Sequence, residues 1–429
     1  MPFYQIIKNF ILKAYFDFDN SYISLYNFHP QLRIFIAING IFFNNRDSKI
    51  RYIWPIFGLL LTFVGFTFEL IFIYHGLTIQ DYSFATESFC YTIILGVIPI
   101  VYTTVLLNKE KIIQLIEDMN GDFIYICRLG SEYKKRFLKG QLYIWILCFM
   151  WLMFLSFVAV VFIMTMVLTL MYQSLFATQD EYTIRPLIFP MWLPEDDPYR
   201  TPNYEIFLFL QIILIFICNL TFGVYVYILF HILLHYYYLM DMIMLAFGVL
   251  FDGLDESVMN LPRSDVKRIQ IQRVLNNRMK QIVRWHTSVF KSVDTVSSVY
   301  GSALVYQVMF SSLAICLMAY QVAVQLDEGK VNFLFIILSI AACLQLWIPC
   351  YLGTIIRNKA FAVGDACWNS GWHETSLGRL LRQDIIIFIL RAQHPVTIKF
   401  TGLPPIQLET FSSIMSTSYS YFNMLRQYK

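Results

Sequence analysis

Charged residues are scarce in this sequence. Asp, Glu, Lys and Arg make up 14% of its 429 residues, whereas a soluble globular domain usually carries about 25%. Hydrophobic residues make up 58%, and the mean hydropathy is +0.57. So many apolar residues require lipid as their solvent, and the net charge of +3 is too small to indicate nucleic acid. We therefore expect an integral membrane protein that contacts membrane lipid and has no nucleic-acid partner.

Motifs for catalysis and metal binding are absent as well. The eight cysteines form no CxxC pair and no cluster with metal-ligand spacing. The sequence has no phosphate-binding loop, no Gly-x-Ser-x-Gly and no nucleophile–base arrangement. His231 and His235 lie four residues apart, but a metal site would need a further ligand. We expect no enzyme activity, no metal and no cofactor.

Long apolar runs dominate what is present. A bilayer core of about 30 Å needs about 20 mostly apolar residues per helix. An all-α fold with seven transmembrane helices is therefore predicted, and its last helix is less apolar. The predicted spans are 52–75, 84–107, 141–172, 204–239, 300–326, 331–356 and 404–426. The segment "DIIIFILRAQHP" is too short to span, so it predicts a half-helix packed against the seventh span, which would make the seventh helix split.

The distribution of basic residues predicts the orientation. Of the 32 Lys and Arg residues, 26 lie on one side of the predicted spans. By the positive-inside rule, this side is cytoplasmic. The N-terminus is then cytoplasmic and the C-terminus extracellular. That orientation is opposite to that of G-protein-coupled receptors, and their Asp-Arg-Tyr and Asn-Pro-x-x-Tyr motifs are also missing.

The fifth span continues a much longer helical segment. From Ser264 to Leu326 there is no proline, and only Gly301 interrupts the segment. About 60 residues at 1.5 Å each make a helix of about 90 Å, which must project into the cytoplasm. Its projecting half carries an apolar stripe that needs a partner, either another subunit or the chain's own loops. The stripe consists of Ile269, Leu275, Ile282, Val283, Val289, Val293 and Val296.

The last span has one polar face. Projected at 100° per residue, that face carries Thr410, Ser413, Ser416, Thr417, Ser420, Met424, Gln427 and Tyr428. The opposite face carries Phe411, Met415, Phe422 and Leu425, with Ser418 as its one polar residue. Two interpretations remain open from the residues alone, namely close helix packing and the wall of a pore. A pore would require several copies around an axis, and bulky Met424 and Tyr428 could gate it by dewetting.

Several of these features together resemble the insect odorant receptors over essentially the whole length. The resemblance rests on the inverted topology, the split final segment and three stretches. These are "IVRWHTSVFKSVD" and "SSLAICLMAYQ" in the long helix, and "PPIQLETFSSIMSTSYSYFNMLR" at the end. The stretch "LPRSDVKRIQIQ" looks similar to the moth pheromone receptors within that family.

The resemblance implies a separate role for each of four parts of the chain. Residues 1–51 would be a cytoplasmic or interfacial segment, and residues 52–263 would hold helices one to four with pocket elements. Residues 264–403 would form a cytoplasmic anchor, and residues 404–429 the pore-lining helix. Family members assemble as heterotetramers with a shared co-receptor subunit in the plasma membrane of olfactory neuron dendrites. By alignment of the chain ends, the gate positions fall on Met424 and Tyr428, next to Gln427; the co-receptor has smaller aliphatic residues at the gate.

Family members bind odorants in the outer half of the membrane. The predicted orientation places there Phe84, Ser88, Tyr91, Leu95, Phe162, Met166, Phe209, Ile213, Phe216, Tyr320, Phe333 and Ile337. Their side chains suit a long apolar molecule, since each buried methylene contributes about 0.8 kcal/mol, and Ser88 or Tyr91 could hold a polar head. Each residue taken singly is more typical of lipid contact or core packing than of ligand binding. Glu87, near the pocket mouth, is either a contact for that head or a solvated helix-end carboxylate.

The predicted function is an odorant or pheromone receptor that is also a ligand-gated, non-selective cation channel subunit. A fatty alcohol, aldehyde or acetate would open it to monovalent and divalent cations. The alternative is an inverted seven-helix receptor that signals through cytoplasmic partners without conducting. A transporter is disfavoured because the sequence shows no inverted repeat and no intramembrane charge pair.

Overall fold

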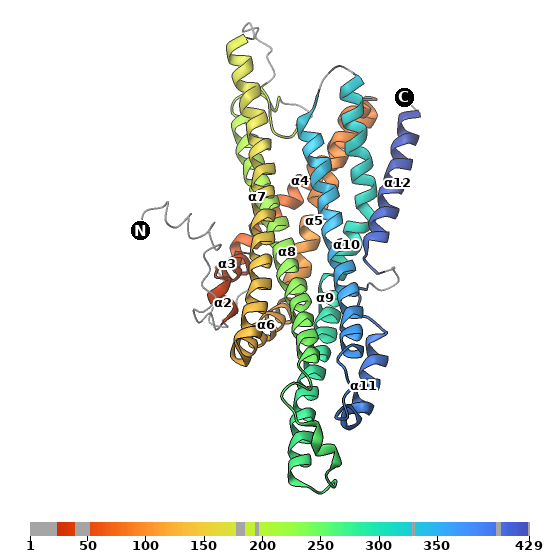
Figure 1. Cartoon of the computed structure of the whole chain (residues 1–429). Helices are drawn as coiled ribbons and strands as arrows, with labels where there is room; N and C mark the ends of the chain where they lie inside the picture. The colour runs from red at the N-terminus through yellow and green to blue at the C-terminus, as the bar shows by residue number, and fades with distance from the viewer. Residues whose placement is uncertain are drawn as a thin grey trace.

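Long helices that run roughly along one axis make up the described part of the chain (Figure 1). The structure is a computed structural model and describes residues 24–38, 52–176, 185–193, 197–327, 329, 331–399 and 405–427. The helices are α2 (Leu25–Phe28), α3 (Gln31–Ile38), α4 (Ile53–Thr78), α5 (Tyr82–Leu107), α6 (Lys109–Leu129), α7 (Ser131–Phe176), α8 (Asn203–Gly248), the 3-10 helix η3 (Glu256–Asn260), α9 (Val266–Asp327), α10 (Phe333–Trp368), α11 (Gly378–Ala392) and α12 (Leu408–Gln427). The predicted all-α fold is confirmed.

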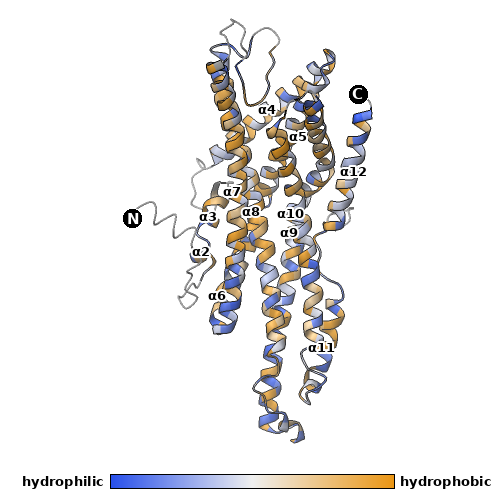
Figure 2. Ribbon diagram, turned by 45° about the horizontal axis from the view of Figure 1, so that its top comes forward, coloured by the Kyte–Doolittle hydropathy of each residue, from blue (hydrophilic) through white to orange (hydrophobic). Residues whose placement is uncertain are grey.

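The membrane-spanning helices correspond to the apolar runs. Within the described residues, six helices are long and apolar enough to cross a membrane, and they are α4, α5, α7, α8, α9 and α10. Helix α12 has 20 residues, about 30 Å at 1.5 Å per residue, which is enough to cross the hydrocarbon core. Figure 2 shows it in paler and bluer colours than most of the neighbouring helices at the same level. The described helices therefore agree with a fold of seven spans.

The long helix α9 extends well beyond the other spans at one end of the molecule (Figure 1). It begins where the sequence predicts, because the carboxylate of Asp265 accepts the amide of Lys267 at 2.8 Å. Most of its apolar stripe is buried in the chain's own core, as Leu275, Ile282 and Val289 show. Among the stripe residues, Ile269 and Val283 stay exposed. The partner of the stripe is therefore mainly the rest of the same chain.

The half-helix before the last span packs differently from the prediction. This helix, α11, lies against α10 and α9 rather than against α12. Its buried residues Leu381, Ile385 and Phe388 follow each other at helical spacing, and the ring of Phe388 lies 4.5 Å from that of His286 on α9. This apolar stripe fits the projecting part of α9, and the packing expectation was wrong for that reason.

The turn before α11 is tied to η3 at the same end of the molecule. The amide of Ser376 donates a hydrogen bond of 3.2 Å to the carboxylate of Glu256. This bond holds the pKa of Glu256 below its ordinary value. It joins two connections that are 120 residues apart in the chain.

Candidate functional site

A mostly apolar cavity of about 160 Å³ lies among α5, α7, α8, α9 and α10, with one lining residue from α4. It sits in the half of the bundle that the sequence assigns to the outside. Residues from all five helices line it, and most of them are aromatic or aliphatic, including Tyr91, Leu95, Trp151, Ala159, Phe162, Cys218, Phe222, Phe310, Ala314, Leu338, Ala341 and Gln345. Concave, apolar sites of this kind with few polar groups are the usual form of a small-molecule site.

The structure brings some of the predicted pocket residues to this cavity. Tyr91, Leu95 and Phe162 line it. Met166 and Ile337 belong to the surrounding apolar cluster, and Ser88 is fully buried at its edge. The remaining predicted residues are not in the lining. These are Phe84, which contacts Phe72, the half-buried Ile213 and Tyr320, and the exposed Phe209, Phe216 and Phe333.

The cavity also contains residues that the sequence analysis did not single out. Trp151, Gln307 and Phe189 belong to this group, and so does Glu69 of α4. Glu69 could have been found, because it is the one Asp, Glu, Lys or Arg between Ile53 and Thr78. An ionisable residue inside a membrane span is by default a candidate for function.

A loop segment covers one end of the cavity. Residues 185–193 precede α8, and within this segment Phe189 lines the cavity with its ring 4.8 Å from Tyr91 and 6.0 Å from Phe162. The side chain of Gln211 fixes the segment. Its Oε1 accepts the amides of Ile188 and Phe189 at 3.0 and 3.1 Å, and its Nε2 donates to the Phe189 carbonyl at 3.0 Å.

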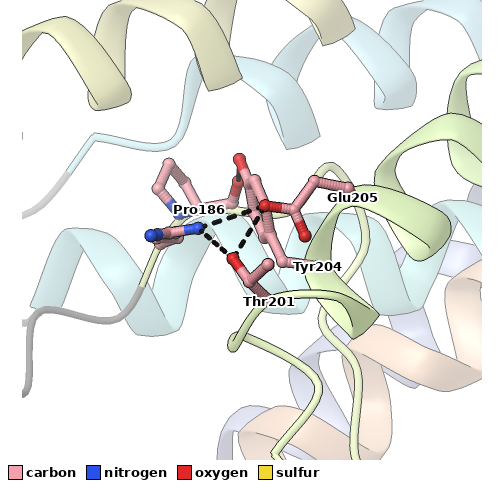
Figure 3. A network of polar contacts seen from close by, with 5 residues as sticks. Pro186, Thr201, Tyr204 and Glu205 are labelled. Carbon is pink, nitrogen blue, oxygen red and sulfur yellow. Dashed lines mark hydrogen bonds and ion pairs between the residues drawn. The ribbon is translucent and has the colours of Figure 1, made fainter.

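A second set of contacts holds the same segment to the start of α8 (Figure 3). The Arg185 guanidinium donates to Thr201 at 3.2 Å and pairs with Glu205 at 3.4 Å. The Thr201 hydroxyl donates to Glu205 at 2.9 Å, and the Tyr204 hydroxyl donates to the Pro186 carbonyl at 3.2 Å. The segment is thus fastened at Arg185 and Pro186 as well as at Ile188 and Phe189.

Replacing Gln211 with leucine is expected to release this segment. The change removes three hydrogen bonds to a buried backbone, and each contributes about 1 kcal/mol net. We expect the Ile188 and Phe189 amides to exchange with solvent at least about tenfold faster. Hydrogen exchange measured by mass spectrometry tests this, with Ile212→Leu on the neighbouring, exposed position as the matched control. Unchanged exchange in the Gln211 variant would contradict the assigned role.

The last helix presents its polar face outward. Helix α12 packs on α9 and α10 through Ile414 and Ser418. Ser413, Ser416, Thr417, Ser420, Met424 and Gln427 are exposed, and Thr410 is half-buried. Tyr428 lies outside the described residues. The polar face predicted from the sequence therefore lies on the surface of the single chain, and the exceptional Ser418 lies inside.

Two hydroxyls of this face have a defined orientation. The Thr417 hydroxyl donates to the Ser413 carbonyl at 2.9 Å, and the Ser420 hydroxyl donates to the Ser416 carbonyl at 3.0 Å. Each hydroxyl has one proton to donate and two lone pairs that accept. Because the protons are bound to the helix, the lone pairs remain for whatever lies outside. The face therefore offers acceptors, which suit water and cations.

The inner end of α12 is docked on α10. Gly353 lies so close to the Ile406 carbonyl that a Cβ there would collide with it. The Thr354 hydroxyl oxygen accepts the Leu408 amide at 2.9 Å. Arg357 donates to Gln407 and pairs with Glu409 at 3.5 Å. Helix α10 thus contacts both the cavity and the start of α12.

Comparison with known proteins gives one consistent result. A family model described as 7tm Odorant receptor matches residues 81–419. Odorant receptor 67c of Drosophila melanogaster is 30% identical over 145 residues, which are 34% of this chain and 35% of the relative. Odorant receptor Or2 of Anopheles gambiae is 23% identical over 153 residues, which are 35% of this chain and 39% of that relative. These matches span little more than a third of the relatives' length.

The fold is similar to a solved structure over nearly its whole length. This is the insect olfactory receptor OR5 from Machilis hrabei in complex with eugenol. The TM-score is 0.74 at 16% identity, and the match covers 94% of this chain and 99% of the other. At this identity, the likeness shows the fold alone.

Proposed function

Because the chain belongs to the insect odorant receptor family, which consists of receptors rather than enzymes, we propose that it is a ligand-gated, non-selective cation channel subunit. It is a multi-pass membrane protein with six apolar helices among its described residues. We place it in the plasma membrane, in the dendrites of olfactory neurons. Its ligand is a small apolar volatile, and its working partner is a shared co-receptor subunit in a heterotetramer.

The observation that carries this proposal is the outward face of α12. Its apolar side already has partners in α9 and α10. Its exposed side has oxygen acceptors at Thr417 and Ser420, whose protons are bound within the helix. Hydrocarbon would offer these acceptors nothing, whereas hydrated cations would interact with them. Four such helices around an axis would enclose a path for ions, with Met424 and Tyr428 as its gate.

The cavity supports a small apolar ligand. About 160 Å³ is close to the volume of an engineered cavity that binds benzene, about 150 Å³. A chain of ten or more carbons therefore binds only if lining side chains move apart. Such a movement can reach the pore helix, because α10 carries both the lining residue Gln345 and the docking residue Gly353. These residues are eight positions apart, about 12 Å along the helix.

Cysteine substitutions on α12 test the proposal directly. In cells that express the chain with the co-receptor, Thr417→Cys and Ser420→Cys should conduct. A charged thiol reagent added from outside should then reduce the ligand-evoked current by more than about half, because it places a charge in the ion path. Ser418→Cys is the matched control, since Ser418 is 3% exposed and faces the protein.

The same recordings separate the channel from the alternative receptor. A current that starts at once and persists without intracellular nucleotides supports the channel. A delayed response that needs nucleotides, together with no effect of the reagent on Thr417→Cys or Ser420→Cys, would contradict it. That outcome would favour signalling through cytoplasmic partners.

A further inference from the structure

One corner of the cavity is polar, and Glu69 lies in it. Glu69 is on the face of α4 that packs against the protein, together with Thr62, Phe72 and Gly76. Its side chain lines the cavity, and the residue is only 5% exposed. Its Oε2 makes no hydrogen bond of normal length and geometry to any described residue. A buried polar atom without a partner costs about 1–3 kcal/mol, and more when charged, so it indicates a missing partner.

The neighbours of Glu69 do not supply that partner. Ser88 is its polar contact, and it is fully buried. Glu87 is a second carboxyl within electrostatic reach, and the Tyr91 hydroxyl donates to it at 3.3 Å. Within the described part of the chain, no lysine or arginine forms an ion pair with Glu69 or Glu87. Near that end of the bundle, the described residues form the ion pairs Arg185–Glu205, Arg200–Asp197 and Arg426–Asp327.

Glu69 and Tyr91 line the corner, Ser88 and Glu87 lie next to them, and the four residues together hold more hydrogen-bond acceptors than donors. Two carboxyl groups contribute four oxygens and about eight lone-pair positions, whereas Ser88 and Tyr91 contribute one O–H each. The Tyr91 proton is already used by Glu87. Even with one carboxyl protonated, acceptors outnumber donors. A ligand fits this corner when it brings a donor of its own.

We propose that Glu69 is a specificity-determining residue that selects ligands with a hydrogen-bond donor on the head, a hydroxyl or an ammonium, behind an apolar tail. This deepens the proposed function and rests on it. The lining beyond the corner is aromatic and aliphatic and takes the tail. Esters, ethers and aldehydes have no such proton and can only accept, so the oxygens of an ionised Glu69 gain no partner when they bind. A buried acceptor left unpaired in this way rejects the analogue that lacks the donor.

A matched series of ligands with one tail tests this assignment. It comprises a primary alcohol, the primary amine of the same length, and the methyl ether and acetate of that alcohol. In the unaltered chain, the alcohol or the amine should bind at least about tenfold more tightly than the ether. Glu69→Leu should remove this preference. Glu69→Gln retains a carbonyl acceptor, removes the charge and adds N–H donors that an ether or ester can accept, so it should lose the amine preference and weaken the alcohol preference.

Two readouts keep the outcomes separate. Current is recorded in cells, and binding is measured as thermal stabilisation of the purified complex, which does not require conduction. Glu110→Gln, in the exposed first turn of α6, is the control and should leave the ligand ranking unchanged. Ligand binding with the expected ranking but no current would overturn the proposed channel and leave the role of Glu69 standing. Equal affinity for the alcohol, the amine and the ether, or an unchanged ranking in both Glu69 variants, would overturn the role of Glu69.

Discussion

Gly353→Val is expected to reduce the ligand-evoked current to less than about a tenth, although ligand still binds. A side chain at this position collides with the Ile406 carbonyl, which belongs to the backbone directly before α12. Overpacking against backbone that cannot move aside costs about 1–3 kcal/mol, so the start of α12 must shift. The shift also pulls Leu408 from Thr354 and Glu409 from Arg357. The variant then lacks the contact through which α10 would move the pore helix.

The collision, rather than a weaker helix, should cause this effect. Valine is a better helix former than glycine, so α10 itself is not destabilised by the change. Gly121→Val on α6 is the matched control, because a Cβ there meets nothing within 4 Å, and its current should stay near that of the unaltered chain. Thermal stabilisation of the purified Gly353 variant by ligand checks that the cavity is intact. A normal current in this variant would show that α12 does not depend on the dock.

Much of this fold could be predicted because lipid imposes a simple pattern. Every apolar run of about 20 residues became a helix, and the absence of proline after Ser264 predicted the unbroken α9. Hydropathy says less about where a helix begins or ends outside the membrane. The run predicted over 141–172 belongs to a helix over Ser131–Phe176. Its first ten residues are mostly polar, so hydropathy gives no sign of them.

Helix α6 shows the same limit. It lies outside the apolar runs, so hydropathy does not reveal Lys109–Leu129. Its buried residues Ile112, Leu115, Met119 and Phe123 recur at helical spacing, which was a usable signal. The position of α11 was not available from sequence at all, since its apolar stripe could have packed on either end of the neighbouring helices.

The faces of α12 could be predicted, whereas those of the pocket helices could not. On α12, polar and apolar residues recur with the helical period, so projection placed Thr417 and Ser420 on the polar face, which is exposed in the structure. Helix α8 is apolar nearly all round, and such a helix gives no rotational signal. The sequence therefore predicted how deep in the membrane Phe209 and Phe216 lie, but not which way their side chains point. In the structure both side chains are exposed. Their role in ligand binding remains a prediction that the cavity does not support.

Filling the cavity should produce the largest change in ligand sensitivity. Ala159→Phe adds a benzene ring to a residue of α7 that lines the cavity. A space of about 160 Å³ is close to that which holds one benzene molecule, so the new ring occupies most of it. We expect the concentration for half-maximal current to rise at least about a hundredfold, which corresponds to about 2.7 kcal/mol of lost binding.

The control for this change adds the same ring outside. Ser156→Phe lies one turn earlier on α7 and is exposed, so it should leave the half-maximal concentration within about threefold. Surface labelling and the current without ligand check that both variants reach the membrane and conduct.

A second outcome for Ala159→Phe also fits the mechanism. Because the new ring fills the cavity, the channel can be partly open without ligand. The ring would then hold the lining side chains apart as a ligand does. An unchanged response to ligand would show that the ligand binds elsewhere, and the α10 route from cavity to α12 would then carry no signal.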